Sequence, residues 1–281
     1  MKLPYSPRGN QEEIIESIRS TFQNRSHIVL ESPTGSGKTF CSLAAALPFA
    51  IENDLRIVYC VRTNSQQKQV IHELRQFKKS GYPVSAVAFQ GRGSLCPEQN
   101  YDNELKKSNW VEKSKMCKSL KMQSKIGEAG CRFYRKLIRG SASLVEEWSS
   151  DILTAEEFSE QAEESGICPY ELNKLLVKDA RVVIVPYVYF FEEFIRNFML
   201  GRMGTSIDNV LVIVDEAHNL PDWARAAASD SLTIETINRA VRESNKYGLQ
   251  LASGNHTTTF LNLVEASIES LAENHIPENE G

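Results

Sequence analysis

The chain has 281 residues, of which 41% are hydrophobic, 24% charged and 9% aromatic. This composition is typical of a folded globular protein and excludes the disordered and fibrous classes. No apolar run approaches the roughly 18–20 residues that a membrane-spanning helix needs. The first residues lack the apolar core of a secretory signal. We therefore expect a cytoplasmic protein without a membrane partner.

The net charge is −4, but the charges are distributed unevenly along the chain. Residues 96–139 contain 11 Lys and Arg against 5 Asp and Glu, whereas residues 146–171 contain nine acidic residues and no basic one. A basic segment can bind phosphates while an acidic face elsewhere is only solvated. On charge alone, two solvated helical faces are the simpler interpretation.

The first ninety residues alternate between helical and strand-like patterns. Apolar residues recur every three or four positions in residues 10–22, which predicts an amphipathic helix. The next expected elements are a strand at 27–31, a helix at 38–51, a strand at 56–61, a helix at 65–78 and a strand at 84–89. This alternation is typical of a parallel sheet flanked by helices.

Residues 91–170 contain no convincing strand, and we interpret them as an insertion into the α/β pattern. The pattern resumes with an apolar strand at 181–185, followed by a helix that contains four phenylalanines. The run at 210–214, Val-Leu-Val-Ile-Val, is apolar on both faces, as central strands of parallel sheets are. From Trp223 onward the sequence looks helical.

A glycine-rich segment lies between the strand expected at 27–31 and the helix that follows it. Its sequence resembles a phosphate-binding loop, with Ser in place of the first Gly of the strict pattern. Glycines let backbone N–H groups turn toward phosphate oxygens, and the N-terminus of the helix adds a positive dipole. Lys38 would reach the β- and γ-phosphates, and the Thr39 hydroxyl would hold Mg²⁺. The ATP-binding residues expected in this loop are Ser32, Thr34, Gly35, Ser36, Gly37, Lys38 and Thr39.

The sequence Asp-Glu-Ala-His directly follows the apolar strand at 210–214. Asp215 would coordinate Mg²⁺, and Glu216 would polarise the attacking water as a general base, since in-line attack on the γ-phosphate needs both roles. A carboxylate pair that only caps the next helix is the structural alternative, and the upstream phosphate loop argues against it. The expected catalytic residues are therefore Lys38, Asp215 and Glu216.

The six cysteines divide into two groups. Cys41 and Cys60 lie in apolar sequence and are expected in the core. The other four, which have polar or basic flanks, are Cys96, Cys117, Cys131 and Cys168. Their separations of 21, 14 and 37 residues include no C-x-x-C pair of the kind typical of structural zinc. Four single thiolates can hold either zinc or a 4Fe–4S cluster, and the spacing does not choose between them.

Taken together and in this order, the motifs resemble the XPD family, the iron–sulfur DNA helicases of DEAH type within superfamily two, with archaeal-type members the most similar. Residues 32–39 and 215–220 resemble helicase motifs I and II. The other matching segments are residues 8–11 (adenine contact), 61–65 (motif Ia, DNA backbone), 91–96 and 168–170 (entry to and exit from the cluster domain) and 185–187 (before motif II).

The resemblance implies ATP, Mg²⁺ and a 4Fe–4S cluster as cofactors, with the four cysteines of the insertion as cluster ligands. It implies that Arg8 and Gln11 contact the adenine and that His218 couples nucleotide to DNA. The residues that it assigns to DNA binding are Arg62, Thr63, Arg92 and Tyr187. The lysines around the cysteines would hold a phosphate backbone. Four aromatic residues would either stack on bases or pack the insertion: Tyr101, Trp110, Phe133 and Tyr134.

The implied activity is ATP-dependent unwinding of duplex DNA with 5′-to-3′ polarity, in DNA repair such as nucleotide excision repair. The implied partners of the monomeric enzyme are single-stranded and forked DNA and repair-complex proteins, with a nucleoid location in a prokaryote or a nuclear one in a eukaryote.

The alternatives are a DinG-like iron–sulfur helicase, a generic P-loop ATPase with a zinc-stapled insertion, and a DNA-binding scaffold with a vestigial nucleotide site. The intact Lys38, Thr39, Asp215 and Glu216 argue against the scaffold.

The expected fold class is α/β, with a RecA-like parallel sheet flanked by helices in residues 1–90 and 175–220. A mostly helical iron–sulfur domain at 91–174 interrupts it, and residues 221–281 resemble the beginning of a helical arch domain. These last residues contain no match to motifs III to VI of a second motor domain. We therefore expect a fragment that binds nucleotide weakly and hydrolyses it poorly by itself.

Overall fold

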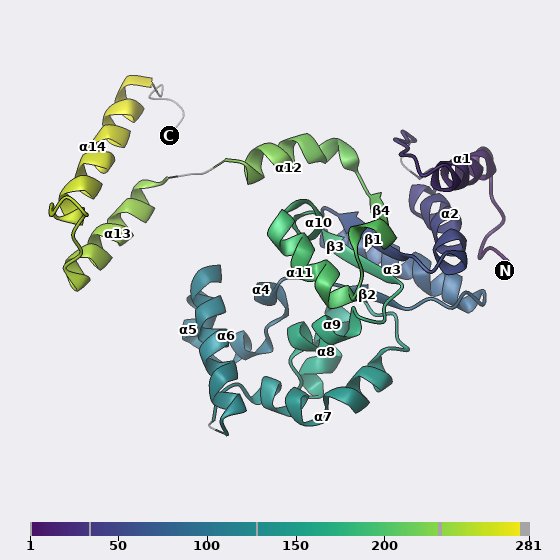
Figure 1. Ribbon diagram of the computed structural model, residues 1–281, viewed down its shortest axis with the longest axis horizontal. Helices are drawn as coiled ribbons and strands as arrows, with labels where there is room; N and C mark the ends of the chain where they lie inside the picture. Colours follow the sequence, from purple (N-terminus) through teal and green to yellow (C-terminus); the bar gives the residue numbers. More distant parts are fainter. Residues whose placement is uncertain (1, 34, 128, 230–231, 276–281) are drawn as a thin grey trace. The chain divides into compact units, whose positions relative to one another are not determined.

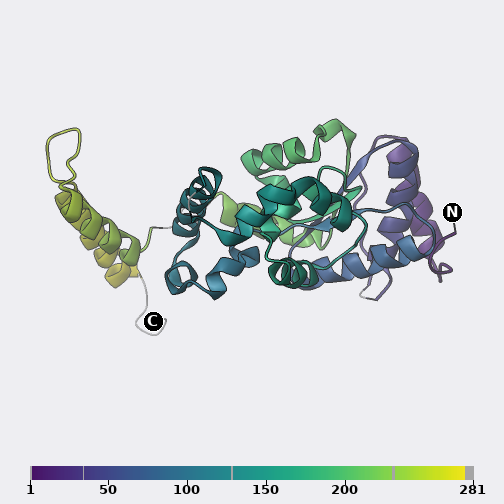
Figure 2. The same ribbon diagram turned by 90° about the horizontal axis from the view of Figure 1, so that it is seen from below.

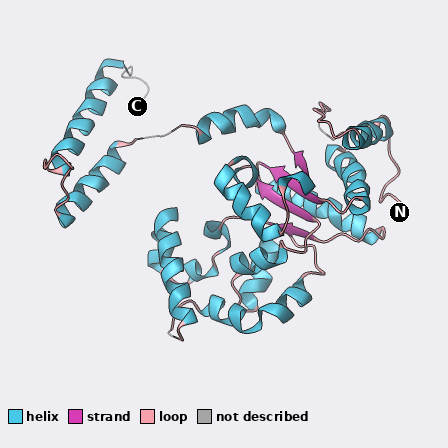
Figure 3. Cartoon of the chain, in the orientation of Figure 1, coloured by secondary structure: helices cyan, strands magenta, loops and turns pink. Residues whose placement is uncertain are grey.

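A parallel sheet lies at the centre of residues 1–217 in the computed structural model, of which residues 2–33, 35–127, 129–229 and 232–275 are described (Figure 1). Helices surround this sheet, in agreement with the predicted α/β class (Figure 3). In the described residues its strands follow the order β2-β3-β1-β4. They are β1 (Arg56–Val61), β2 (Ala86–Ala88), β3 (Val182–Pro186) and β4 (Val210–Val214).

The ladders hold the strand ends in register. Tyr59 of β1 pairs with Ile184 of β3 on one side and with Ile213 of β4 on the other, and all these pairings are parallel. The carboxyl ends of parallel strands meet at one edge of a sheet, which is where α/β proteins bind ligands. The residues that follow β1, β3 and β4 are therefore brought close together.

Three helices cover one face of the sheet. They are α1 (Gln11–Gln23), α2 (Lys38–Glu52) and α3 (Asn64–Lys79). Alternate residues of β1, Ile57, Tyr59 and Val61, face the core that these helices enclose. The start of α3 is fixed by a capping box, in which Thr63 and Gln66 satisfy each other's backbone N–H groups.

The insertion consists of helices in the described residues. They are α4 (Arg92–Leu95), η1 (Pro97–Asn100), α5 (Asn103–Lys107), α6 (Trp110–Lys125), α7 (Arg132–Trp148), α8 (Ala155–Glu164) and α9 (Pro169–Leu176). The helices after β3 are α10 (Val188–Phe191), α11 (Glu193–Met203) and η2 (Ile207–Asn209), and η3 (Ala217–Asn219) follows β4. No helix in the described part of the chain is both long and apolar enough to cross a membrane.

The chain divides into two compact units, Met1–Ala217 and His218–Gly281. The helices of the second unit are α12 (Leu220–Ala227), α13 (Ile234–Tyr247) and α14 (Thr257–His275). Helices α13 and α14 pack side by side, and their connection contains an antiparallel bridge between Gln250 and His256 (Figures 1 and 2). The three-part domain division expected from the sequence stays a prediction.

Three expected strands differ from the structure. The strand expected at 84–89 is reduced to β2, and the segment at 27–31 is irregular, with the Val29 side chain 96% exposed. A strand needs a neighbour to satisfy its backbone N–H and C=O groups, and no described strand pairs with residues 27–31. The expectation that 210–214 forms a central strand is also wrong, because β4 is a half-buried edge strand among the described residues.

The acidic segment of the insertion is not simply solvated, because part of it is bound to α3. Arg75 donates to the carbonyl oxygen of Ile152 at 2.7 Å and pairs with the carboxylate of Glu157. Lys68 pairs with Glu156 at 3.1 Å, although both of these side chains are nearly half exposed. Basic residues of α3 therefore tie the insertion to the sheet domain.

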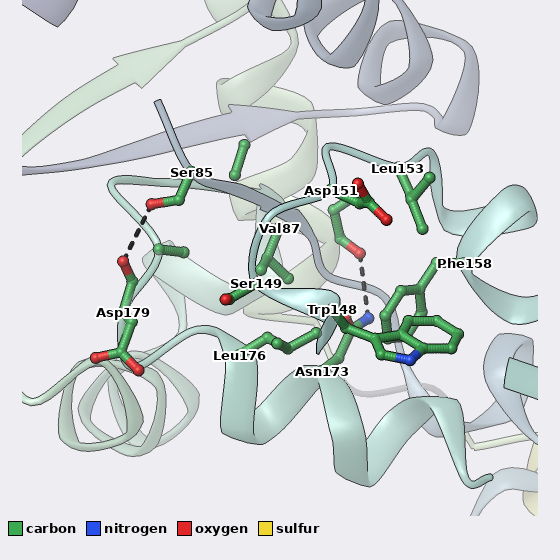
Figure 4. Close-up of a pocket in the computed structure, with 13 residues that line it drawn as sticks. Ser85, Val87, Trp148, Ser149, Asp151, Leu153, Phe158, Asn173, Leu176 and Asp179 are labelled. Atoms are coloured by element: carbon green, nitrogen blue, oxygen red, sulfur yellow. Dashed lines mark hydrogen bonds between the residues drawn. The ribbon is translucent and has the colours of Figure 1, made fainter. Parts of the chain in front are cut away.

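A small hollow lies where the insertion meets the edge of the sheet at β2 (Figure 4). Trp148 packs edge-on against Phe158, with their ring centroids 5.2 Å apart. The side chain of Asn173 donates to the carbonyl oxygen of Ala88 at 3.3 Å. None of the site residues expected from the sequence lines this hollow. We therefore interpret it as a packing gap between the insertion and the edge of the sheet.

Replacing Arg75 by Met should lower the free energy of unfolding by roughly 1–2 kcal/mol, because the Ile152 carbonyl and Glu157 lose their donor. The hydrogen bond from Arg75 is the main cause that lowers the pKa of Glu157 to about 2. A lowered carboxylate pKa stabilises the fold above the unfolded value of about 4.3, and this stabilisation is lost as the pH falls toward 2. Urea unfolding should therefore show the difference between variant and unaltered chain shrinking below about pH 4.

The matched control is Lys68→Met, which removes an ion pair that water already screens. It should cost less than about 0.5 kcal/mol at neutral pH. A penalty for Arg75→Met that does not depend on pH would contradict the assigned role of Glu157.

Candidate functional site

The phosphate loop ends in two glycines with left-handed backbone. Gly35 has φ of 81° and Gly37 has φ of 82°, immediately before α2 begins at Lys38. A Cβ atom at Gly37 would lie 2.5 Å from Nε2 of Gln11, so a side chain here would both strain the backbone and collide. Thr34, also expected in this site, lies outside the described residues.

Gln11 joins the expected adenine-contacting segment to the phosphate loop. Its Nε2 donates to the carbonyl oxygen of Ser36 at 2.8 Å, and its Oε1 accepts from the backbone N–H of Arg8 at 2.9 Å. The two residues that the sequence assigned to the base are thus held against each other and against the loop.

The side chains of the phosphate loop can bind an anion. Lys38 Nζ donates to the carbonyl oxygen of Ser32 at 2.8 Å, which keeps the ammonium group over the loop. The Ser36 hydroxyl is buried and has no hydrogen-bond partner among the described residues. A buried hydroxyl without a partner is costly, and a phosphate oxygen would satisfy it. The residues of the loop therefore fit a nucleotide phosphate.

Thr39 sits at the base of the loop and is largely buried. Tyr59 of β1 lies close enough for the side chains of Ser42 and Thr39 to act on the pKa of its hydroxyl. Burial raises the pKa of Tyr59, so the hydroxyl stays protonated. The sequence did not identify Tyr59 as a supporting residue, because its apolar strand context only indicated a core position.

The carboxylates of motif II lie at the same sheet edge as the phosphate loop. The backbone N–H of Asp215 donates to the carbonyl oxygen of Cys60 at 2.9 Å, which continues the β1–β4 ladder by one residue. Burial and the neighbouring Glu216 raise the pKa of Asp215, while the charge of Lys38 opposes this rise. Lys38 and Asp215 are thus close enough to interact, as a shared Mg²⁺–phosphate site requires.

Tyr187, expected to bind DNA, is instead directed inward. Its side chain is 2% exposed. The hydroxyl donates to the carbonyl oxygen of Asp215 and lies 3.1 Å from the carbonyl oxygen of Glu216. The sequence placed Tyr187 before motif II, but it could not show that the side chain reaches the backbone of that motif.

The other residues expected to bind DNA occupy different settings. Arg62 is exposed at the end of β1, and Thr63 caps α3 by accepting from the backbone N–H of Gln66 at 3.3 Å. A capped helix N-terminus beside an exposed arginine suits a phosphate group. His218 belongs to the second unit, where its ring Nε2 lies 3.0 Å from the side-chain amide of Asn219.

The four cysteines of the insertion line one cavity, although they come from four different elements. Cys117 lies within α6, and the other three precede helices. Those three are Cys96 before η1, Cys131 before α7 and Cys168 before α9. Cys41 and Cys60 lie outside this cavity and are buried, as expected.

Backbone N–H groups lie near enough to three of these thiols to act on their pKa values. Burial raises the pKa of Cys168 to about 12, while the N–H of Glu171 opposes the rise. Burial also raises the pKa values of Cys96 and Cys131, and N–H groups of the helices that follow them again act in the opposite direction. Such N–H groups favour a thiolate ligand over a thiol, so the donor set fits a thiolate-bound metal or cluster.

Two cations also line the cysteine cavity. Arg92 donates to the Ser114 hydroxyl at 2.9 Å and lies 5.0 Å from the centre of the Tyr170 ring. Its Nε is buried, and no described residue accepts a hydrogen bond from it. Lys121 pairs with Glu171 at 2.8 Å. Arg92, expected to bind DNA, thus lies in the wall of the cavity, where positive charge would balance thiolates.

Within the described residues, no three His, Cys, Asp or Glu side chains are grouped closely enough for a single metal ion. The four thiols therefore share a cavity without forming a single-ion site in this conformation. The choice between zinc and a 4Fe–4S cluster, left open by the spacing, needs a chemical measurement.

One face of α6 is basic and exposed. Lys115, Lys118 and Lys125 project from it, together with Met122, which is 62% exposed. Of the four aromatic residues expected here, Phe133 is buried, and the guanidinium of Arg132 lies 3.9 Å from the centre of the exposed Tyr101 ring. The ammonium group of Lys121 lies 5.5 Å from the centre of the Tyr134 ring, and the side chain of Trp110 lies outside the described part.

Known proteins are similar to this chain in sequence. The Regulator of telomere elongation helicase 1 homolog of Arabidopsis thaliana is 27% identical over 308 residues, covering 97% of this chain and 28% of that protein. The Regulator of telomere elongation helicase 1 of Homo sapiens is 27% identical over 300 residues, covering 88% of this chain and 23% of that protein. The chain thus spans about a quarter of the length of these curated relatives.

Two solved structures have the same fold. A chain titled XPD_Helicase aligns with a TM-score of 0.58 at 20% identity, covering 94% of this chain and 41% of that one. A chain titled Truncated XPD aligns with a TM-score of 0.56 at 20% identity, covering 92% and 65%. The model of the family described as DEAD_2 matches residues 59–237, which is more than half of the chain. The chain therefore belongs to the DEAD_2 family.

Proposed function

We propose that this chain is the nucleotide-binding and strand-separating part of an ATP-dependent DNA helicase. The observation that supports this most is the meeting of two motifs at one sheet edge, where the charges of Lys38 and Asp215 interact. Mg²⁺ would lie between the Thr39 hydroxyl and Asp215, and Glu216 would polarise the water that attacks the γ-phosphate. Arg8 and Gln11 would contact the adenine.

The complete helicase needs more than these residues. The phosphate loop and motif II supply one wall of an ATP site, and hydrolysis also needs positive charge from a second motor domain. The chain spans about a quarter of the length of its curated relatives. We therefore propose that the activity belongs to a longer protein, with a 5′-to-3′ polarity and a DNA repair role by family resemblance.

DNA would be held at two places in this chain. One is the start of α3, where Arg62 and the capped helix N-terminus suit a phosphate group. The other is the basic face of α6, where lysines would hold the backbone of a single strand at a fork. The proposed substrate is therefore forked DNA with a single-stranded tail, and the proposed protein partners are those of a repair complex.

We propose a 4Fe–4S cluster as the group that the four cysteines hold. The cluster would join four separate elements of the insertion through its thiolates and so keep the module rigid. Arg92 and Lys121 would lie beside its negative charge. Zinc remains the alternative, and the metal content decides between them.

Replacing Lys38 by Ala in the complete protein should lower the rate of DNA-stimulated ATP hydrolysis at least about a hundredfold, because the γ-phosphate loses a preorganised positive charge. Unwinding of forked duplexes should be lost with it. Lys79→Ala, at the exposed end of α3, is the control and should leave both activities unchanged. Duplexes with only a 5′ or only a 3′ tail test the polarity. Unwinding by Lys38→Ala would contradict the proposed function.

Protein purified without oxygen should contain about four iron and four acid-labile sulfide atoms per chain. Cys117→Ser should lose most of this iron, since one thiolate ligand is removed. Cys60→Ala should retain it, because Cys60 is buried in β1 away from the cavity. Stoichiometric zinc without sulfide would overturn the cluster and support the zinc-stapled alternative.

Replacing Lys115, Lys118 and Lys125 together by Ala should weaken binding of single-stranded DNA and flatten its dependence on salt. Each lost phosphate contact removes about 0.7 from the slope of log K against log salt concentration for single strands, so three contacts predict a change of about 2. The control is the triple replacement of Lys2, Lys79 and Lys178, which are exposed elsewhere. An unchanged slope would exclude this face of α6 from the DNA site.

A further inference from the structure

Tyr187 connects two strands of the sheet at their carboxyl ends. It follows β3 directly and precedes the short helix α10 (Figure 1). Its hydroxyl reaches across to motif II, where it donates to the carbonyl oxygen of Asp215 and lies 3.1 Å from that of Glu216. The side chain is 2% exposed, so a nucleobase cannot stack on its ring. Its hydroxyl is held against the backbone of motif II.

The backbone that Tyr187 contacts is strained. Glu216 has φ of 49°, a left-handed conformation that is uncommon for a residue with a side chain. Such a conformation persists only where the surroundings hold it, and strained residues of this kind gather at active sites. The backbone N–H of Glu216 is itself turned back to Oδ1 of Asp215 at 3.1 Å. The direction of the Glu216 side chain therefore depends on how this turn is held.

Two contacts fix the turn from outside. On the β1 side, the carbonyl oxygen of Cys60 accepts from the N–H of Asp215 at 2.9 Å. On the β3 side, the hydroxyl of Tyr187 donates to the carbonyl oxygens of Asp215 and Glu216. The first contact extends the sheet ladder and ends at the N–H of Asp215, so it does not reach the carbonyl groups of Asp215 and Glu216. Tyr187 supplies the contact at these carbonyl groups.

We propose that Tyr187 is a positioning residue for Glu216: its hydroxyl holds the left-handed turn that directs the general base at the attacking water. This inference rests on the proposed function, because it assigns Glu216 its role in ATP hydrolysis. In this proposal Tyr187 positions Glu216 and does not contact DNA directly.

The charge state of the hydroxyl suits this role. Burial, followed by the nearby Asp215, raises the pKa of Tyr187 to about 12, while Arg62 acts in the opposite direction. The hydroxyl is therefore protonated at neutral pH and remains a donor for the carbonyl oxygens. The ring also packs edge-on against Phe191, with centroids 6.1 Å apart, so removal of the oxygen alone should leave the ring in place.

The test is Tyr187→Phe in the complete protein, measured by the steady-state kinetics of DNA-stimulated ATP hydrolysis. The kcat should fall about tenfold, the loss expected when one directed hydrogen bond stops holding the general base. The KM for ATP, the affinity for single-stranded DNA and the Tm should stay close to their original values, because the phosphate loop, the exposed DNA contacts and the ring packing are untouched.

The matched control is Tyr189→Phe. Tyr189 lies two residues further on, packs against Phe89 with centroids 5.1 Å apart, and is not among the groups that act on Asp215. It should retain the original kcat. An unchanged kcat in Tyr187→Phe would overturn the inference, as would equal losses in both variants that follow a fall in Tm. A specific loss of DNA affinity with kcat intact at saturating DNA would also overturn it and restore the DNA role.

The same experiment separates this inference from the proposed function. If the unaltered protein hydrolyses ATP and Tyr187→Phe equals it, only the role of Tyr187 is wrong. If the unaltered protein does not hydrolyse ATP with DNA present, the proposed function and this inference both fail.

Discussion

The parallel ladder between β1 and β4 is the constraint on which the candidate site depends. It ends with the hydrogen bond between Asp215 and the carbonyl of Cys60, one residue beyond the strand. The bond fixes where the carboxylates of motif II leave the sheet, and it does so at the edge where α2 and the phosphate loop begin. A shift of register by one residue would turn the side chains of β4 to opposite faces. Asp215 would then leave the position at which the charge of Lys38 acts on its pKa.

Much of the fold follows from the sequence because the signals are local. Apolar periods and continuous apolar runs located α1, α2, α3, β1 and β4 to within a few residues. The strand at 27–31 failed for a reason that no local signal contains: a strand is stable only beside a neighbour, and the described residues provide none for it. The continuous apolar run at 210–214 predicted a central strand. In the structure β4 lies at the edge of the described sheet, because β1 is the one described strand that pairs with it.

The candidate site divides in the same way. Candidate residues that belong to a motif, such as Lys38 and Asp215, were predicted from spacing and context. Supporting residues such as Tyr59 and Tyr187 were not, because their roles depend on which backbone or hydroxyl lies across the sheet. The four cysteines are an intermediate case. Their polar flanks marked them as a set, but only the fold shows that three of them precede helices around one cavity.

The open outer edge of β4 has a practical consequence for the 281-residue chain handled by itself. An unpaired strand edge offers a row of backbone donors and acceptors to any other extended segment. The described residues also place exposed apolar side chains, Ile28 and Val29, in the irregular segment before the phosphate loop. The isolated chain therefore carries both a template and a matching segment for self-association.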